Sequence, residues 1–223
     1  MESVIRSVLH KSVLFQDIGG DECGKLISCL SPQIKKYSKN EIIIMTGDYA
    51  RHIGVILLGT ACAYVEHVSG SQTIMANLSP MSVFGEILVS TRTHKSPVTV
   101  YATSDVTAAF IDYQKVHSIC ATACVAHRIF IQNMLKTIGD KYFLLFDRIN
   151  ILQEKTLRGR ILAYLYALGG MGKRRRVTIP YTKTMLASYL LANRSALSKE
   201  LSKMEKDGII AVNGREIEIK QWE

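Results

Sequence analysis

The chain has 223 residues, of which 48% are hydrophobic and 21% are charged, and its formal net charge at pH 7 is +9. This length allows a full core in one or two domains, and the composition excludes a disordered chain. No apolar run approaches the ~18 residues that a membrane-spanning helix needs, so we expect a cytoplasmic protein without a membrane partner. The odd number of cysteines, five, argues against a disulfide framework.

Two short helices are predicted at the start of the chain. Residues 1–15 have the pattern of an amphipathic helix. Because they include Glu2 and His10, they lack the continuous apolar segment of a signal peptide. Residues 21–30 carry Leu26, Ile27 and Leu30 on one side of a second helix.

From residue 41 to residue 112 the pattern changes to short β-branched runs separated by glycine and proline. The predicted strands cover residues 42–45, 53–58, 61–68, 73–78, 98–101 and 106–111. Such regular spacing is typical of an antiparallel roll or barrel, and Ser69-Gly70-Ser71 suits a hairpin turn. We expect the interior of this roll to hold a small ligand.

A long helix is predicted over residues 123–152. Spacings of four and three alternate along its apolar seam: Ile131, Leu135, Ile138, Tyr142, Leu145, Ile149 and Leu152. A repeat of about 3.5 residues keeps one seam facing a partner helix, which predicts a parallel homodimer. The alternative is that the seam packs only on the chain's own roll. Phe130, Met134, Phe143 and Phe146 supply further apolar surface beside it.

The excess of positive charge follows this helix. Residues 151–223 hold 14 Lys and Arg against 7 Asp and Glu, a net charge of +7, whereas residues 1–150 have a net charge of +2. A helix over residues 157–168 ends at the Gly-rich run 169–172, and four adjacent cations, residues 173–176, lead into a strand at 177–179. The cations suit either a solvated turn or contact with phosphates.

Residues 182–206 have the pattern of two short helices joined by a turn. Their buried stripes are Leu186 and Leu190 in the first helix and Leu197, Leu201 and Met204 in the second. Asn193 suits an N-cap, because its side-chain oxygen can accept a hydrogen bond from an amide of the next turn. Two helices joined in this way form a helix-turn-helix.

The exposed face of the second helix carries hydroxyls and cations. A helix of this width fits the major groove of B-DNA, where an N-terminal arginine such as Arg194 can donate to guanine O6 and N7 together. The segments 209–212 and 216–219 flank an Asn-Gly turn and predict a hairpin, so the motif is a winged helix-turn-helix. The alternative is a helical hairpin with an ordinary solvated face.

Three stretches, LASYLLANRSALSKELSKMEKDGII in the motif and SVFGEI and GDYARHIGVILLGTA in the roll, carry a family resemblance. The chain resembles, over nearly its whole length, the cyclic-AMP receptor / fumarate-nitrate reductase regulator (Crp/Fnr) family of bacterial transcription regulators. The resemblance implies an α+β fold with a cupin-like, cyclic-nucleotide-binding-type antiparallel β-roll (residues 1–122). A long dimerisation helix (123–152) and a C-terminal winged helix-turn-helix (153–223) follow.

The resemblance also implies roles for single residues of the motif. Arg194, Ser195 and Lys199 fall where bases are read, and Thr182, Asn193 and Lys203 fall where phosphates are contacted. The turn glycine usual in the family is Leu191 here. This turn must therefore avoid a left-handed backbone or accept some strain.

The effector pocket implied by the resemblance contains Gly85, Glu86, Lys95 and Ser96. The receptor for cyclic AMP holds the ribose with a Gly-Glu pair, which this chain keeps, and the phosphate with an Arg-Ser pair. Here Ser96-Pro97 takes the second place and Lys95 lies one residue early. Lysine lacks the planar fork of arginine, so cyclic AMP is not the expected effector, which stays unidentified.

An iron–sulfur cluster is not expected either. The oxygen-sensing members of the family use closely spaced N-terminal cysteines, and this chain lacks them. Cys120, Cys124 and His127 could present three ligands on one helical face, but buried free cysteine is the commoner state. We predict no metal site and leave a redox or metal role of these three residues open.

The leading hypothesis is a homodimeric, sequence-specific DNA-binding transcription regulator, controlled by a small effector or redox signal sensed in the roll. Its partners would be a palindromic duplex, a second copy of the chain and, for an activator, RNA polymerase. The alternative is a ligand sensor of the cyclic-nucleotide type that signals through protein partners instead of DNA. The sequence contains no catalytic constellation, so no enzyme activity is expected.

Overall fold

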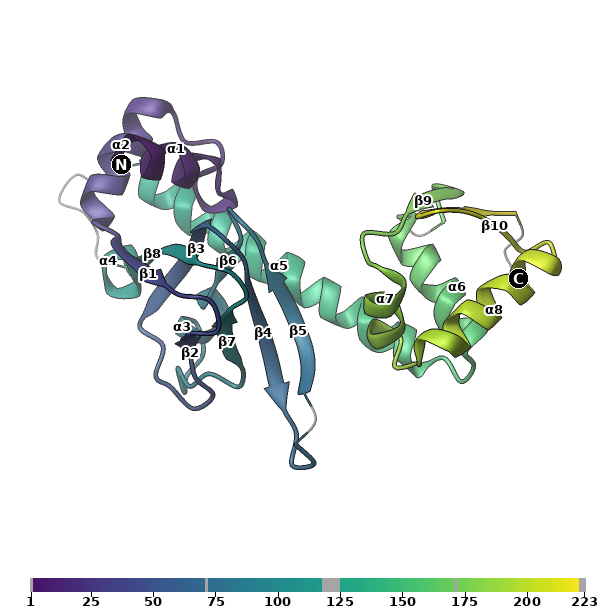
Figure 1. Cartoon of the computed structure of the whole chain (residues 1–223). Helices are drawn as coiled ribbons and strands as arrows, with labels where there is room; N and C mark the ends of the chain where they lie inside the picture. Colours follow the sequence, from purple (N-terminus) through teal and green to yellow (C-terminus); the bar gives the residue numbers. More distant parts are fainter. Residues whose placement is uncertain (1, 71, 118–124, 171, 221–223) are drawn as a thin grey trace. The chain divides into compact units, whose positions relative to one another are not determined.

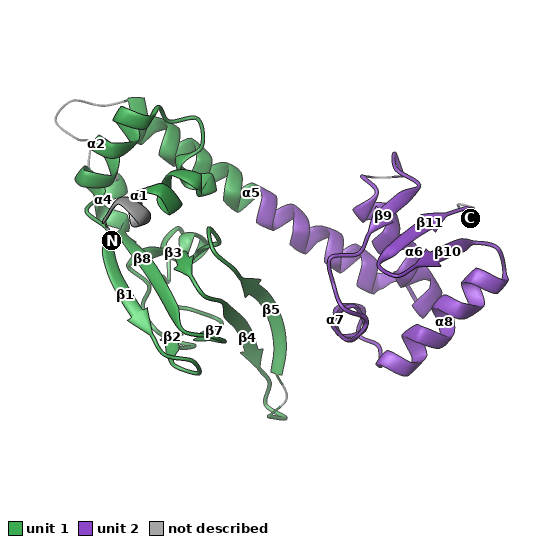
Figure 2. Ribbon diagram, turned by 45° about the horizontal axis from the view of Figure 1, so that its top comes forward, with its two compact units in different colours: residues 1–139 green, residues 140–223 purple. Residues whose placement is uncertain are grey.

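The computed structural model describes residues 2–70, 72–117, 125–170 and 172–220. The chain divides into two compact units, Met1–Gly139 and Asp140–Glu223 (Figure 2). The long helix α5 (Val125–Gln153) contributes residues to both units. Among the described residues, no helix combines the length and the apolar character that crossing a bilayer requires.

The first unit is a roll of two antiparallel sheets accompanied by short helices (Figure 1). Its strands are β1 (Gln33–Tyr37), β2 (Ile42–Ile44), β3 (His52–Leu58), β4 (Ala61–Glu66), β5 (Gln72–Leu78), β6 (Val83–Phe84), β7 (Thr99–Ala102) and β8 (Val106–Asp112). They form one sheet of order β1-β8-β3-β6 and another of order β2-β7-β4-β5. Its helices are α1 (Glu2–Lys11), η1 (Val13–Phe15), α2 (Gly20–Leu30), α3 (Glu86–Val89) and α4 (Tyr113–His117).

Strand β3 serves two cores, one on each face of its sheet. Ile53, Val55 and Leu57 belong to a core that includes residues of α1, α2 and α5, whereas Ile56 belongs to the core between the two sheets. Successive side chains of a strand point to opposite faces. A continuous apolar run is therefore what a strand covered on both faces requires.

The six strands predicted for the roll are confirmed, with ends shifted by one or two residues. Two further strands had no apolar pattern: β1 is a largely exposed strand with the sequence QIKKY, and β6 has only two residues. The predicted turn at residues 69–71 lies partly outside the described residues, which omit Ser71. The predicted start of the long helix at residue 123 also lies outside them.

The two ends of α5 belong to different cores. In the first unit, Phe130 and Met134 are buried, and Asn133 Nδ2 donates a hydrogen bond of 2.7 Å to the carbonyl of Gln16. In the second unit, Ile151 is buried with residues of the C-terminal helices. The helix is thus anchored near both ends.

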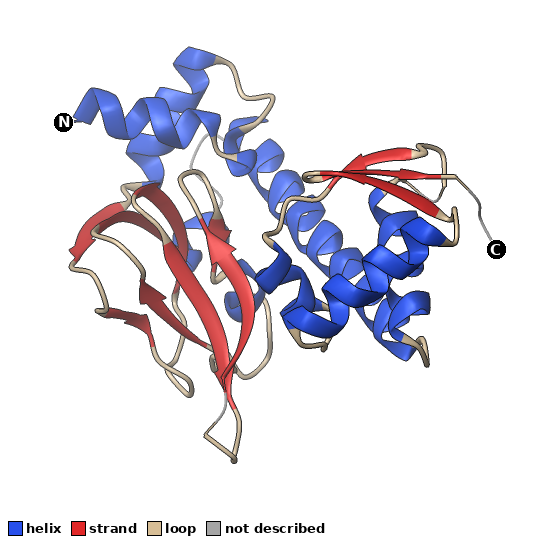
Figure 3. Ribbon diagram, turned by 45° about the vertical axis from the view of Figure 1, so that its right-hand side comes forward, coloured by secondary structure: helices blue, strands red, loops and turns tan. Residues whose placement is uncertain are grey.

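The second unit is a winged helix-turn-helix (Figure 3). Its elements are α6 (Leu157–Leu168), β9 (Arg176–Thr178), α7 (Lys183–Tyr189), α8 (Arg194–Lys206), β10 (Ile210–Asn213) and β11 (Glu216–Ile219). The sheet has the order β10-β11-β9, and Leu165, Leu190 and Leu197 lie in the core beneath it. The elements predicted here are confirmed to within about one residue at each end.

Leu191 occupies the turn between α7 and α8 with a left-handed backbone of φ 51°. The turn therefore accepts strain. For a residue with a Cβ atom this conformation costs about 1–2 kcal/mol. Because the Leu191 side chain is 62% exposed, packing does little to offset that cost.

Leu191→Gly is expected to raise the free energy of unfolding by about 1 kcal/mol, since glycine adopts this conformation without steric cost. Urea denaturation followed by far-UV circular dichroism measures the change. Leu190→Gly is the matched control: Leu190 is fully buried, so its loss lowers stability by several kcal/mol, roughly 3–5. A lower stability for Leu191→Gly would show that the turn is not strained.

Candidate nucleic-acid interface

Two side-chain caps fix the starts of the helix-turn-helix helices. Thr182 Oγ1 accepts a hydrogen bond from the Met185 amide (3.3 Å), and Asn193 Oδ1 accepts one from the Ala196 amide (2.8 Å). The predicted N-cap role of Asn193 is confirmed. Capping uses only the acceptor oxygen of each side chain, so the Thr182 hydroxyl hydrogen and the Asn193 Nδ2 amide remain suitable donors to a phosphate.

Helix α8 buries one face and exposes the other. Its buried side chains are Leu197, Leu201 and Met204. Its exposed side chains include Arg194, Ser195, Lys199 and Lys203. Ser195 Oγ donates to Asn193 Oδ1 (2.9 Å), so as long as this bond is kept the Ser195 hydroxyl can act toward other groups only as an acceptor.

Two arginines of α6 hold the motif in place. Arg158 donates from Nε to Glu200 (2.7 Å) and from Nη2 to Asp207 (2.7 Å), which ties α6 to the middle and the end of α8. Arg160 donates to the carbonyls of Leu190 (3.0 Å) and Glu154 (3.1 Å). The orientation of α8 therefore depends on α6 as well as on the apolar core.

Tyr164 of α6 is buried behind the motif, and its hydroxyl has no hydrogen-bond partner within the described part of the chain. The rings of Tyr189 and Tyr181 lie 5.5 and 6.4 Å from its ring. Burial raises the pKa of Tyr164 well above its ordinary value, and the two neighbouring tyrosines raise it further. The environment thus favours the neutral phenol.

Tyr164→Phe is expected to raise the free energy of unfolding at pH 7 by about 1 kcal/mol, because a buried unpaired hydroxyl costs about 1–3 kcal/mol. A pKa raised by folding contributes stability that is present below the unfolded pKa of about 10 and lost as pH rises above it. The melting temperature of the variant should therefore fall less between pH 9 and 11 than that of the parent. Parallel pH profiles for the two proteins would contradict the assignment.

The wing is the hairpin of β10 and β11. Asn213 pairs with Glu216, so the two connecting residues are Gly214 and Arg215 and the predicted Asn-Gly turn lies one residue further along. The shift arises because Asn213 is still paired in the ladder. Glu205 of α8 accepts from the Val212 amide (3.0 Å) and fixes the wing to α8.

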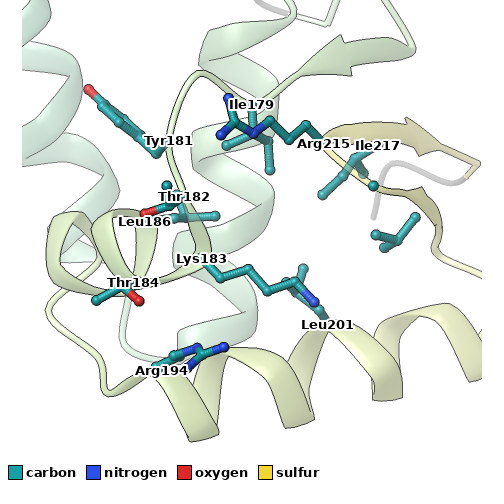
Figure 4. Close-up of a pocket in the computed structure, with 12 residues that line it drawn as sticks. Ile179, Tyr181, Thr182, Lys183, Thr184, Leu186, Arg194, Leu201, Arg215 and Ile217 are labelled. Atoms are coloured by element: carbon teal, nitrogen blue, oxygen red, sulfur yellow. The ribbon is translucent and has the colours of Figure 1, made fainter.

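A cleft of about 330 Å³ lies between the starts of α7 and α8 and the wing (Figure 4). Three cationic side chains line it, those of Lys183, Arg194 and Arg215, together with the hydroxyls of Thr182 and Thr184. None of its lining residues is acidic. We name it the α7–wing cleft.

Sequence reasoning did not assign Lys183 and Arg215 to the interface. The cationic face predicted from the sequence is that of α8, and 31 positions of sequence separate Arg215 from Thr184. The pairing of β11 with β9 brings the wing turn to the start of the motif, where the Ile179 amide donates to the Arg215 carbonyl (2.8 Å). No local pattern of residues predicts that pairing.

The four-cation run at residues 173–176 lies at the other end of the wing sheet. The Ile219 amide donates to the Arg175 carbonyl (2.7 Å), and Arg176 forms a 3.4 Å ion pair with Glu218. All four side chains are exposed, and none of them lines the α7–wing cleft. The structure is compatible with both interpretations of this run, a solvated turn and a contact with phosphates.

The exposure of the predicted seam of α5 differs along the helix. Ile131 and Ile138 are half-buried against the core of the first unit, as the alternative of packing on the chain's own roll requires. In contrast, the exposed fractions of Leu135, Tyr142, Leu145 and Ile149 lie between 47% and 61%. Leu152 is half-buried. Such a row of exposed apolar side chains is typical of an interaction surface.

The four residues expected in an effector pocket differ from one another in how exposed they are. Gly85 has a left-handed backbone (φ 81°) and precedes the buried Glu86 at the start of α3. Ser96 is buried, and its hydroxyl donates to the Val98 carbonyl (2.7 Å). The side chain of Lys95 is exposed.

Aromatic side chains occupy the core between the two sheets of the roll. The Phe84 ring lies 5.8 Å from that of Phe110 and packs against Gly54, where a Cβ atom would overlap it. Over residues 7–70 and 72–116, no Arg or Lys side chain is buried. A bound phosphodiester needs a fixed cation, and the one cation among the four residues of the predicted pocket is the exposed Lys95.

The cysteine hypothesis rests partly on residues that the structure leaves undescribed. Cys120 and Cys124 lie outside the described residues, and His127 is buried. Among the described residues, no group of three or more His, Cys, Asp or Glu side chains is arranged to hold a metal ion. Burial raises the pKa of the Cys23 and Cys62 thiols, which disfavours the thiolate form that binds metals.

Two family models match the chain, the cyclic nucleotide-binding domain over residues 34–123 and the Crp-like helix-turn-helix domain over residues 159–223. Among solved structures, the chain is similar to a CooA variant from Carboxydothermus hydrogenoformans, with a TM-score of 0.62 and 22% identity over 87% of this chain and 86% of that chain. No curated protein matches it.

Two further structures show the same fold. FixK2 from Bradyrhizobium japonicum has a TM-score of 0.55 and 18% identity, over 85% of this chain and 93% of that chain. The catabolite activator protein of Thermus thermophilus has a TM-score of 0.52 and 18% identity, over 94% of each chain.

A nucleotide-binding-type roll, a long helix and a Crp-like helix-turn-helix, in this order, define a DNA-binding transcription regulator. The chain belongs to the Crp/Fnr family of such regulators. The predicted α+β fold and the predicted family are confirmed.

Proposed function

We propose that the protein is a homodimeric regulator that binds a palindromic DNA sequence under the control of a small effector sensed in the roll. The observation that carries the proposal is the exposed face of α8. Arg194, Ser195 and Lys199 project from a helix whose opposite face is buried and whose start is capped. The exposed face of such a helix can enter a major groove while its buried face stays packed on the core.

The contacts divide into base contacts, which specify the sequence, and phosphate contacts, which position the protein. Arg194 is proposed to donate to guanine O6 and N7, with Ser195 and Lys199 contacting neighbouring bases. Thr182, Asn193 and Lys203 are proposed to contact phosphates. The two N-caps support this division, because each keeps a donor at the start of a helix.

The exposed seam of α5 supports the dimer. A second copy of α5 would cover Leu135, Tyr142, Leu145 and Ile149, which the single chain leaves exposed. Two α8 helices related by a two-fold axis would then enter successive major grooves, about 34 Å apart. This geometry requires two half-sites one helical turn apart.

Control by an effector requires a ligand that binds one arrangement of the dimer better than another. The proposed hinge is the segment 150–155, where α5 ends at Gln153 and Thr156 caps α6. The effector is proposed to be a molecule other than cyclic AMP, since the predicted pocket has no buried cation. No iron–sulfur cluster is proposed. RNA polymerase would be a partner if the regulator is an activator.

Selection of duplexes from a random library by the full-length protein tests the proposal, with and without a panel of small metabolites. The expected result is an inverted repeat whose half-sites are one helical turn apart. Fluorescence anisotropy on that site should show a steep loss of affinity with salt, because cations on the protein displace counterions from the DNA. The rival function, a sensor that signals through protein partners, predicts no enriched sequence in any condition.

A further inference from the structure

Arg158, the second residue of α6, forms a branched ion pair with helix α8. Its Nε atom donates to Glu200 Oε1 and its Nη2 atom donates to Asp207 Oδ2, both at 2.7 Å. The exposed fractions of the Arg158, Glu200 and Asp207 side chains are 26%, 23% and 40%. One guanidinium thus holds two carboxylates of α8, which the planar fork of arginine can do and the single ammonium of lysine cannot do with the same geometry.

The two carboxylates lie on the same side of α8. Glu200 and Asp207 are seven residues apart, which corresponds to two helical turns and to about 10 Å along the helix axis. The core contacts of α8 come from Leu197, Leu201 and Met204, and such apolar contacts are non-directional. Hydrogen bonds constrain a helix more sharply, because their energy falls steeply with distance and angle. Two of them, two turns apart, oppose both rotation and sliding of α8 against α6.

The proposed base contacts need an accurately oriented α8. Arg194 and Lys199 are exposed and project from other sides of the helix than the side that is bonded to Arg158. A rotation of α8 by about 20° about its axis moves side-chain tips, which lie roughly 5–6 Å from the axis, by about 2 Å. The donor–acceptor distances of good hydrogen bonds vary by only ~0.5 Å. A small rotation of α8 would therefore break the paired bonds by which an arginine recognises guanine.

We propose that Arg158 is a positioning residue for sequence discrimination, which sets the orientation of α8 through its bonds to Glu200 and Asp207. The assignment rests on the proposed reading of bases by α8. Partly exposed ion pairs add little to the stability of a fold. The role inferred for Arg158 is therefore the orientation of a helix, and it acts on the bases only through that helix.

The DNA arm measures the affinity of the full-length protein for the selected palindrome and for random duplexes. Arg158→Gln is expected to lower the ratio of the two affinities by about 10-fold, the order of magnitude of one lost base contact. The unpaired carboxylates of Glu200 and Asp207 would also weaken binding to every duplex, so the readout is the ratio. Arg158→Lys should recover only part of the ratio, because lysine retains the charge without the fork.

Arg176→Gln is the matched control for the DNA arm. Arg176 lies in the wing sheet and forms an ion pair of 3.4 Å with Glu218, so this variant makes the same change in charge and also breaks an ion pair. It should leave the ratio unchanged, because even a lost phosphate contact weakens all duplexes alike. Adding Glu200→Ala to Arg158→Gln should lower the ratio no further, since the bond that it removes is already lost.

A second arm uses the full-length protein without DNA. Residual dipolar couplings of the backbone amides in α6 and α8 measure the angle between the two helices. Arg158→Gln is expected to change this angle, whereas Arg176→Gln should keep the parent's value. An unchanged angle in Arg158→Gln overturns the assignment, and so does a changed angle with a ratio equal to that of the control. Circular dichroism checks folding, and Glu200→Ala replaces Arg158→Gln in both arms if the latter is unfolded.

The two arms separate failure of the assignment from failure of the proposed function. If the parent protein prefers no duplex over another while the angle still depends on Arg158, the proposed reading of bases fails and the orienting role of Arg158 stands. If the parent is sequence-specific and Arg158→Gln keeps its ratio, the assignment fails and the proposed function stands.

Discussion

Leu145→Arg in α5 is expected to convert the dimer to a monomer and to lower affinity for the palindromic site by about 10²–10⁴-fold. Leu145 belongs to the exposed part of the seam, so the substitution removes little packing from the folded chain. In the dimer it would bury an unpaired charge against the same position of the partner helix. Binding of one subunit would then no longer raise the effective concentration of the other at the second half-site.

Leu144→Arg is the matched control for this prediction. Leu144 is the adjacent residue, is 67% exposed and lies away from the seam, since consecutive residues point to different sides of a helix. This variant should stay dimeric and keep its affinity. Light scattering after size-exclusion chromatography measures the mass, and anisotropy measures binding. A dimeric Leu145→Arg variant, or a monomeric Leu144→Arg variant, would refute the proposed interface.

Arg194→Ala is expected to cost about 1–3 kcal/mol of binding at one base position of the site, or roughly 5–150-fold, and to abolish discrimination there. The reason is the loss of a paired hydrogen bond to one guanine. Arg194→Lys should restore overall affinity in part but not the discrimination, because lysine retains the charge without the fork. Lys203→Ala, by contrast, should weaken all duplexes equally.

Anisotropy on the selected palindrome and on its single-base variants measures these effects. The decisive comparison is between specific and random DNA. If Arg194→Ala loses affinity equally on both, Arg194 contacts the backbone, and its place beside the α7–wing cleft explains the result. The circular dichroism of the variant serves as the folding control, since the capping bond of α8 comes from Asn193 and not from Arg194.

The distribution of apolar side chains along α5 is compatible with both interpretations of its pattern. Phe130 and Met134 are buried in the core of the first unit, so this stripe packs on the chain's own roll. Phe143 and Phe146 remain exposed beside the seam and would widen an interface with a second copy. If α5 forms the proposed dimer and the roll binds the proposed effector, a ligand-induced change in the roll could pass directly to this helix, provided that the ligand distinguishes two arrangements.

Local signals in the sequence are sufficient to predict the elements of the winged helix-turn-helix. The leucines at helical spacing, the Asn193 cap and the glycine after α8 each act within one or two turns of the chain, so they predict an element wherever it lies in the fold. The same holds for the central strands of the roll, whose β-branched runs are long enough to be recognised as strands in the sequence. Strand β1 was missed because its Lys35 and Lys36 are exposed and leave no apolar pattern.

Contacts between segments that are distant in the sequence could be identified only from the tertiary structure. Arg215 reaches the cleft only because β11 pairs with β9, and the register of the wing, not its Asn-Gly pair, places Arg215 in the turn. The Ser96 hydroxyl, which the sequence predicts in the effector pocket, donates to the Val98 carbonyl, a bond that no sequence pattern predicts. Such outcomes follow from pairing and burial, whose energies depend on residues far apart in the chain, whereas caps and helical stripes depend only on neighbours.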